Sequence, residues 1–329
     1  MADAKHNTKI EWTHLPGFKG ETWNPVVGCT KVSQGCKHCY AETLHDRRHK
    51  AFVGGAALPV QYAEPFNHVR LLTHRLELPL HWQKPRSVFV NSLSDLFHED
   101  VPQGFSDEVF AVMALRPSHR FMVLTKRHQR MYDYTHDATV RERVSEVAER
   151  LLETHGTRQE RWSLSRRRNA WRPTVGAWPL PNVWLGVSVE DQKAADARIP
   201  VLAETPAAVR FLSCEPLLGP LEFDITEEEG DDYGDGAVYW NMLTGVRWMR
   251  DGIEKELNPT LPIHWVIAGA ESGSGARPMD EAWVRGIRDA CRDAQVPFFY
   301  KQNADKSRKL SVPELDGVRH TAFPPIEGV

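Results

Sequence analysis

The sequence predicts an α/β fold, in the form of a partial or complete parallel β/α (TIM-like) barrel with insertions. Short apolar runs rich in β-branched and aromatic residues recur along the 329-residue chain, and helical patterns lie between many of them. The runs are continuously apolar rather than alternating, which is typical of parallel strands that are covered on both faces. Strands that alternate with helices favour a right-handed β/α barrel or an open parallel sheet.

About seven such strands are expected, and most end in polar or acidic residues. They are Thr22–Val27, Ser87–Asp95, Phe121–Lys126, Val183–Glu190, Val209–Glu215, His264–Ser272 and Pro297–Gln302. In β/α barrels the carboxyl ends of the strands point into one mouth, where the active site is built. The polar strand-end residues are therefore expected to converge there.

Three helices are expected between the strands. Ser106 is expected to cap a helix over Asp107–Leu115, with acidic residues in its first turn. Thr139–Thr154 carries valines and leucines at helical spacing and ends before Gly156. Asp280–Ala294 has one apolar face.

We expect residues 1–305 to form a single barrel domain with an N-terminal cysteine loop, followed by a C-terminal tail over 306–329. Two insertions interrupt the pattern, at about 156–181 and 222–262. The first combines arginines with tryptophans, a mixture suited to phosphate contacts and base stacking, although a solvated basic loop or a protein-docking arm fits it as well. In the second, the acidic segment Glu222–Asp235 is expected to be a flexible surface loop.

Cysteine spacing is the most informative chemical feature of the chain. Cys29, Cys36 and Cys39 follow a C-x6-C-x2-C pattern, and only two other cysteines occur. The C-x2-C pair places two sulfurs on one turn and Cys29 supplies a third, so the spacing predicts a metal site. An iron–sulfur cluster held by three cysteines leaves one iron open, whereas structural zinc would need a fourth ligand such as His38 or a distant residue. Cysteines this sparse, with no secretory signal, disfavour a disulfide framework.

Composition sets outer limits on function. Hydrophobic residues make up 41% and charged residues 26% of the chain, and the formal net charge is −3. These values are ordinary for a globular protein, and they give no global attraction to nucleic acid. No run approaches the roughly twenty apolar residues of a membrane span, and the N-terminus is too polar for a signal peptide. We expect a cytoplasmic protein with no membrane partner.

Four strings of residues carry a resemblance to a known family. They are Thr22–Glu42, which holds the three cysteines, Val90–Asp100, Phe211–Pro220 and Gly269–Pro278. Together they resemble the bacteriophage three-Cys-motif family, which is distantly similar to radical S-adenosylmethionine enzymes, and the match runs from about Ile10 to Gln302. Those enzymes usually carry C-x3-C-x2-C after the first strand of a partial barrel, whereas the first spacer here has six residues.

The resemblance implies an iron–sulfur enzyme of radical S-adenosylmethionine type. Cys29, Cys36 and Cys39 would be the ligands of a 4Fe-4S cluster, and S-adenosylmethionine would chelate the open iron. From their strand-end positions, we expect seven residues to hold the cofactor: Asn91, Ser92, Lys126, Ser188, Glu190, Glu271 and Ser272. Arg127 is an alternative to Lys126 for the cofactor's carboxylate.

Four further strand-end residues are candidate catalytic groups: Asp95, Cys214, Glu215 and Lys301. A thiol at Cys214 could donate a hydrogen atom, although Cys214 and Cys291 also fit small core residues. The expected partners are DNA, RNA or a nucleotide, an electron donor, and a separate partner protein. The alternative function is a zinc-binding, nonradical nucleic-acid-binding or accessory protein.

Overall fold

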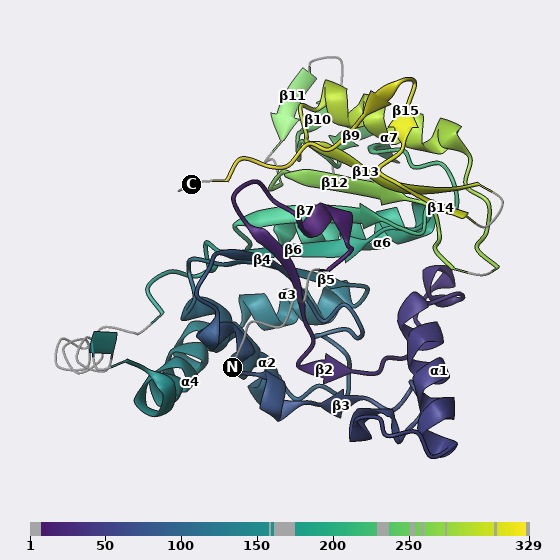
Figure 1. Cartoon of the computed structure of the whole chain (residues 1–329). Helices are drawn as coiled ribbons and strands as arrows, with labels where there is room; N and C mark the ends of the chain where they lie inside the picture. Colours follow the sequence, from purple (N-terminus) through teal and green to yellow (C-terminus); the bar gives the residue numbers. More distant parts are fainter. Residues whose placement is uncertain are drawn as a thin grey trace. The chain divides into compact units, whose positions relative to one another are not determined.

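The structure is a computed structural model, and it describes residues 8–157, 159–160, 175–228, 237–250, 254–257, 260–273, 275–305 and 308–326. The chain divides into two compact units (Figure 1). Unit 1 comprises Met1–Leu185 and Pro206–Ala208, and unit 2 comprises Gly186–Thr205 and Val209–Val329. The arginine- and tryptophan-rich part of the insertion at about 156–181 lies mostly outside the described residues.

The main sheet has eight strands in the order β1-β4-β5-β6-β7-β12-β13-β14. Their bounds are β1 Lys19–Trp23, β4 Arg86–Val90, β5 Arg120–Thr125, β6 Val183–Ser188, β7 Val209–Cys214, β12 Trp265–Gly269, β13 Phe298–Asp305 and β14 Arg308–Ser311. The pairs β1–β4, β4–β5, β7–β12 and β12–β13 are parallel, and the pair β13–β14 is antiparallel. The α/β class is therefore confirmed, with a mainly parallel sheet and flanking helices that are compatible with a partial barrel.

Unit 1 is built on β1, β4 and β5. All five residues of β4 are buried, as continuous hydrophobicity predicts for a strand covered on both faces. Its helices are α1 Tyr40–Val53, α2 Gln103–Ala114, α3 His128–His136 and α4 Val140–His155. A separate antiparallel pair joins β2 Val26–Val27 to β3 Arg70–Leu71. Short 3-10 helices are η1 Glu11–Thr13, η2 Gln34–Cys36, η3 Val60–Tyr62, η4 Thr73–Arg75 and η5 Leu78–His81.

Unit 2 contains β7, β12, β13 and β14 with two helices, α6 Gln192–Glu204 and α7 Glu281–Asp293. Trp265, on β12, is fully buried, and its ring lies 6.0 Å from that of Phe211 and 5.5 Å from that of Phe323. A second sheet is antiparallel and runs β11-β10-β9-β8. Its strands are β8 Asp224–Glu228, β9 Ala237–Asn241, β10 Arg247–Arg250 and β11 Glu254–Leu257, and a final hairpin joins β15 Glu314–Leu315 to β16 Val318–Arg319.

Three details differ from the sequence predictions. The expected strand Thr22–Val27 is divided between β1 and β2, with Asn24 and Pro25 at the break; Pro25 has no N–H to donate to a strand partner. Ser106 lies inside α2 rather than at its N-cap. The helix begins at Gln103, four residues before the expected first residue Asp107, and Pro102 precedes it. Glu222–Asp235 was expected to be a loop, but Asp224–Glu228 forms β8 and pairs with β9.

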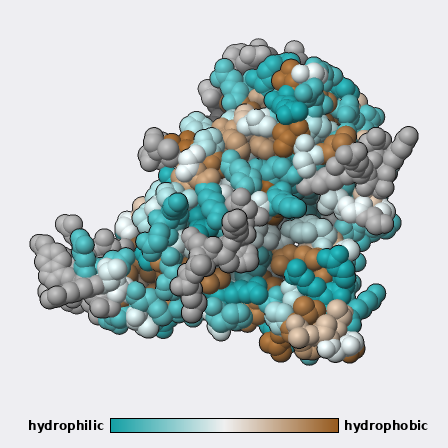
Figure 2. All heavy atoms as spheres, in the orientation of Figure 1, coloured by the Kyte–Doolittle hydropathy of each residue, from teal (hydrophilic) through white to brown (hydrophobic). Residues whose placement is uncertain are grey.

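The face drawn in Figure 2 is mostly hydrophilic, with apolar residues in scattered groups. Among the described residues, no helix combines the length and the apolar character needed to cross a membrane.

Candidate functional site

The three cysteines lie on one connection of unit 1, residues 28–39, which we call the cysteine loop. It begins at Gly28, whose φ of +88° is the left-handed conformation that glycine adopts without strain. A Cβ at this position would lie 2.4 Å from the carbonyl oxygen of His68. Cys29 N then donates to Phe66 O at 2.9 Å. Cys36 closes η2, and Cys39 is the N-cap residue of α1.

The segment 91–95, at the carboxyl end of β4, holds the start of the cysteine loop. Asn91 Oδ1 accepts from Val26 N at 3.3 Å, and Ser94 Oγ donates to Val26 O at 2.8 Å. Gly28 forms a parallel bridge with Ser94. These contacts attach β2 and the first residue of the loop to the end of the main sheet.

Ser92 lies at the centre of a second group of contacts. Its Oγ donates to Asn24 Oδ1 at 3.2 Å, and Asn24 Oδ1 also accepts from Leu93 N at 2.9 Å. Tyr40, directly after the last cysteine, donates its hydroxyl to Ser92 O. Segment 91–95 therefore binds the chain on both sides of the cysteine loop. Asn91 and Ser92, predicted to hold a cofactor, make hydrogen bonds that support the loop.

Asp95 organises the carboxyl end of β5. Its carboxylate accepts from Thr125 Oγ1 at 2.7 and 2.9 Å, from Lys126 N at 3.1 Å and from Phe97 N at 3.0 Å. Asp95 is 5% exposed. These four hydrogen bonds fix the orientation of the Asp95 carboxylate beside the loop.

Arg127 connects this carboxylate to the first cysteine. It is 6% exposed, and Nη1 donates to Asp95 Oδ2 at 3.3 Å and to Cys29 Sγ at 3.5 Å. Nε donates to both oxygens of Glu99 at 3.0 and 2.9 Å, and Nη2 donates to Thr30 Oγ1 at 2.8 Å. The planar guanidinium thus spans two carboxylates and two residues of the cysteine loop, which is a use suited to arginine rather than lysine.

Burial and nearby carboxylates set the protonation of the loop thiols. Burial, followed by the charge of Asp95, raises the pKa of Cys29 to about 11, and Arg127 opposes this shift. Burial also raises the pKa of Cys39. The Arg127 pKa is itself raised, because Asp95, Cys29 and Glu99 together outweigh the opposing effect of burial. Metal binding would therefore displace a proton from Cys29, since thiolates are the metal-binding form.

Across the described residues, no three histidine, cysteine, aspartate or glutamate side chains are arranged as ligands of a single metal ion. All three cysteines are half-buried free thiols. The charge of Cys36 is a minor contributor to the raised pKa of Cys29 and of Cys39. The metal site predicted from the cysteine spacing therefore stays a prediction.

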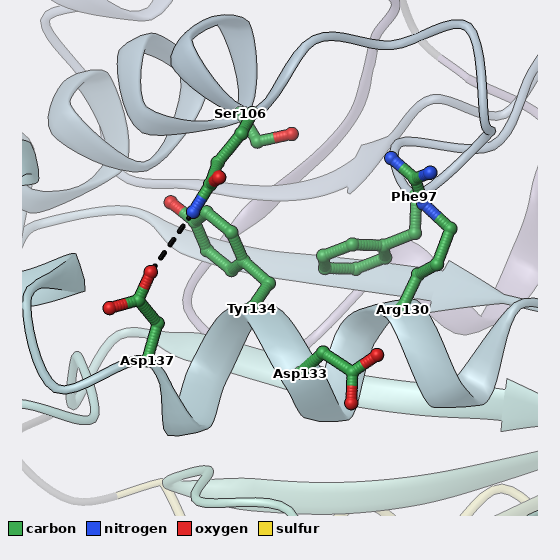
Figure 3. Close-up of a pocket in the computed structure, with 7 residues that line it drawn as sticks. Phe97, Ser106, Arg130, Asp133, Tyr134 and Asp137 are labelled. Atoms are coloured by element: carbon green, nitrogen blue, oxygen red, sulfur yellow. Dashed lines mark hydrogen bonds between the residues drawn. The ribbon is translucent and has the colours of Figure 1, made fainter.

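A pocket of about 360 Å³ lies beside this region in unit 1. Phe97 lines it together with residues of α2 and α3 and the residue that follows α3, namely Gln103, Ser106, Arg130, Asp133, Tyr134 and Asp137. Figure 3 shows Arg130 and Asp133 rising from α3, and the hydrogen bond from Gln103 to Asp137, which is 3.1 Å long. The Phe97 and Tyr134 ring centroids are 5.9 Å apart. The pocket therefore combines an aromatic wall with charges of both signs.

Unit 2 pairs most of its predicted site residues with a neighbour. Lys301 Nζ donates to both oxygens of Glu215 at 2.5 and 2.6 Å, so these two candidate catalytic residues do meet. Arg198 Nη1 donates to Ser188 O at 2.7 Å and to Glu190, which is fully buried, at 2.8 Å.

The other three predicted residues of unit 2 are Glu271, Ser272 and Cys214. Arg277 Nε donates to Glu271 at 3.0 Å, and Ser272 is half-buried after β12. Cys214 has no exposed surface, and burial raises its pKa well above the ordinary thiol value. That burial is typical of a small core residue. The expected catalytic role of Cys214 and the cofactor-binding roles of the others stay predictions.

Two residues of the site, Asn24 and Thr30, were not singled out from the sequence. Thr30 and His98 meet through a 2.8 Å contact between Oγ1 and Nε2, and Asp100 N donates to His98 Nδ1 at 3.0 Å. Asn24 accepts from Ser92 Oγ and Leu93 N. Both residues lie within the string that carries the cysteines, which was the one available signal, because their partners are distant in sequence.

A family model described as "Protein of unknown function (DUF5131)" matches residues 7–324. No curated protein and no solved structure matches the chain.

Proposed function

The chain belongs to the DUF5131 family, and we propose that it is an iron–sulfur enzyme of radical S-adenosylmethionine type. Cys29, Cys36 and Cys39 would hold a 4Fe-4S cluster, which supplies one-electron chemistry to S-adenosylmethionine when bound. The observation that supports this proposal most is the attachment of the cysteine loop to the ends of β4 and β5, through segment 91–95 and Arg127. Strand ends are where β/α enzymes place their reacting groups.

The roles of the chain's own residues follow from these contacts. Segment 91–95 would fix the position of the loop, and Arg127 would orient Cys29. In unit 2, taken by itself, the Glu215–Lys301 ion pair would move a proton or bind a charged group. We also propose that the main sheet and its helices form a TIM-like partial barrel. The protein is further proposed to be cytoplasmic and phage-related.

The substrate is proposed to be a nucleic-acid component, namely DNA, RNA or a nucleotide. Support comes from the arginines and tryptophans of the first insertion, in a chain whose net charge is −3. Reaction of this type also requires an electron donor, and a separate partner protein is a further proposed component.

The test is purification without oxygen, followed by reconstitution with ferrous iron and sulfide. We expect about four irons per chain, together with cleavage of S-adenosylmethionine to 5′-deoxyadenosine after reduction. Cys36→Ala should lose most of the iron, because the remaining two thiols cannot hold the cluster, whereas Cys291→Ala on α7 should keep it. One zinc per chain and no iron would instead favour the zinc-binding, nonradical alternative.

A further inference from the structure

The pocket between α2 and α3 takes no part in the proposed function, yet three kinds of hydrogen-bond donor meet at it. We propose that this pocket binds the phosphate group of a small organic phosphate. Its volume of about 360 Å³ lies within the range of small-molecule sites. The inference does not rest on the proposed function, because the described residues that line the pocket include none of the three cysteines.

The first donor is the guanidinium of Arg130, on α3. Arg130 is exposed, and among the described residues its guanidinium makes one hydrogen bond, a long one of 3.4 Å from Nη2 to Val101 O. A guanidinium has five N–H donors and a full positive charge. Most of its capacity for an anion is therefore available at the pocket.

The second donor is the N-terminus of α2, whose first turn contributes Gln103 and Ser106 to the pocket. Its N-cap residue, Pro102, makes no side-chain hydrogen bond, and the first turn contains no acidic residue. In the described part of the chain, the backbone N–H groups of Gln103 and Gly104 have no acceptor. Free N–H groups and the positive end of the helix dipole favour an anion here.

The third donor is a buried hydroxyl, which points to a ligand independently of the helix end. Ser106 is 4% exposed, and its Oγ has no hydrogen-bond partner among the residues that the structure describes. Figure 3 shows this hydroxyl directed toward the side of the pocket where the Arg130 guanidinium lies. A buried polar group without a partner costs free energy, so a ligand oxygen would supply the acceptor that Ser106 lacks.

Two carboxylates also line the pocket, and neither prevents an anion from binding. Asp137 accepts from Thr139 N at 2.8 Å and from Arg143 Nη1 at 2.7 Å, so its charge is compensated. Asp133 is exposed, and water and salt screen its charge. The uncompensated charge nearest the α2 N-terminus is thus the cation of Arg130.

The rest of the pocket indicates what the phosphate is attached to. Its volume is roughly twelve times that of one water molecule in the liquid, which is more than a phosphate ion fills. Phe97 and Tyr134 form an apolar wall, with ring centroids 5.9 Å apart. Donors on two different helices suit the tetrahedral oxygens of phosphate, and the organic part of the ligand would lie against the two rings.

The experiment measures binding of inorganic phosphate, adenosine 5′-monophosphate and adenosine by isothermal titration calorimetry at low ionic strength. The nucleotide should bind more tightly than inorganic phosphate, and adenosine should bind more weakly than the nucleotide by about tenfold or more. Ser106→Ala and Arg130→Gln should each weaken nucleotide binding by about tenfold or more. Ser106→Ala should not lower stability, because its hydroxyl has no partner to lose within the described residues.

Gly104 offers a second test that does not remove a donor. A Cβ at this position would meet nothing within 4 Å, so a side chain fits. Gly104→Glu places a carboxylate at the first turn of α2, where it stabilises the helix but repels phosphate. It should weaken nucleotide binding, whereas the neutral Gly104→Gln should keep it. Arg141→Gln is the control for loss of an arginine, because Arg141 lies on α4 and donates to Val175 O and Gly176 O.

Three results would overturn the inference. They are no binding of phosphate or nucleotide by the wild type, equal affinities for adenosine and its monophosphate, and unchanged nucleotide binding in either Ser106→Ala or Arg130→Gln. The titrations use the full chain before any iron is added. Failure of this inference would therefore leave the proposed function untouched, and a chain that takes up no iron would leave this inference untouched.

Discussion

Gly28 shows how one backbone position places the first cysteine. Its φ is positive, and the carbonyl oxygens of Phe66 and His68 occupy the space that a side chain would need. The same Phe66 oxygen accepts from Cys29 N. A side chain at position 28 would therefore displace the segment that fixes Cys29.

We predict that Gly28→Ala is destabilising by about 2 kcal/mol or more, since strain at a positive φ is combined with a clash against backbone. The variant should also bind less iron after reconstitution. Gly55→Ala is the matched control: its φ is +89°, but nothing lies within 4 Å of the added Cβ. Urea unfolding compares the two variants. Equal losses in both would show that the close approach at Gly28 contributes nothing.

The candidate site was only partly predictable at this scale. The three cysteines stand out by their short spacing regardless of the fold, and the metal site that the spacing indicates stays a prediction. The role of Arg127 could not be predicted, because its partners Cys29, Asp95 and Glu99 are 98, 32 and 28 residues away in sequence. Asn91 and Ser92 follow the end of β4, as the sequence predicted. Their hydrogen bonds to Val26 and Asn24 depend on the break between β1 and β2, which the sequence did not indicate.

Among the elements, the buried strands were the most predictable. β6, β7 and β12 lie within the expected ranges and β5 begins one residue early, at Arg120, because an uninterrupted apolar run has few alternatives to a covered strand. Helix α7 begins after Asp280, as its apolar face indicated. Helix α2 was placed too late, because Ser106 was interpreted as a cap although the helix continues back to Gln103. The antiparallel sheet of unit 2 was missed because acidic composition conceals strand pairing.

Helix α6 provides a test at the scale of the element. Asp191 is its N-cap residue and accepts from Ala194 N at 2.9 Å. Asp191→Ala should lower the free energy of unfolding by about 1 kcal/mol, since one donor in the first turn loses its partner. Thermal or urea unfolding measures the change. Asp293→Ala, at the last residue of α7, is the control and should change stability by no more than about 0.5 kcal/mol.

For the molecule as a whole, acid should act through a buried histidine. His119 is fully buried in unit 1, and its Nδ1 accepts from Arg86 N at 3.3 Å. Burial, followed by the nearby arginines, lowers its pKa from 6.5 to about 4. His119 therefore binds a proton more readily in the unfolded chain than in the folded one. The stability associated with a neutral His119 is complete above pH 6.5 and decreases as the pH falls toward 4.

We predict that this single group costs about 3 kcal/mol of stability between pH 6.5 and pH 4. His119→Asn retains an acceptor near the position of Nδ1 and cannot take up a proton, so its stability should depend less on pH over that range. His136→Asn, at an exposed position on α3, should keep the wild-type dependence. Urea unfolding at a series of pH values provides the comparison, and an unchanged slope for His119→Asn would contradict the assignment.

The double attachment of the cysteine loop has a thermodynamic consequence. Asn24 and Val26 are tied to segment 91–95 ahead of the cysteines, and Tyr40 is tied to it behind them. Much of the conformational entropy of this connection is thus given up when the polypeptide folds rather than when an ion arrives. If a chelator removes the metal proposed to bind these cysteines, the main sheet should therefore stay folded. Small zinc domains differ, because they unfold when their metal is removed.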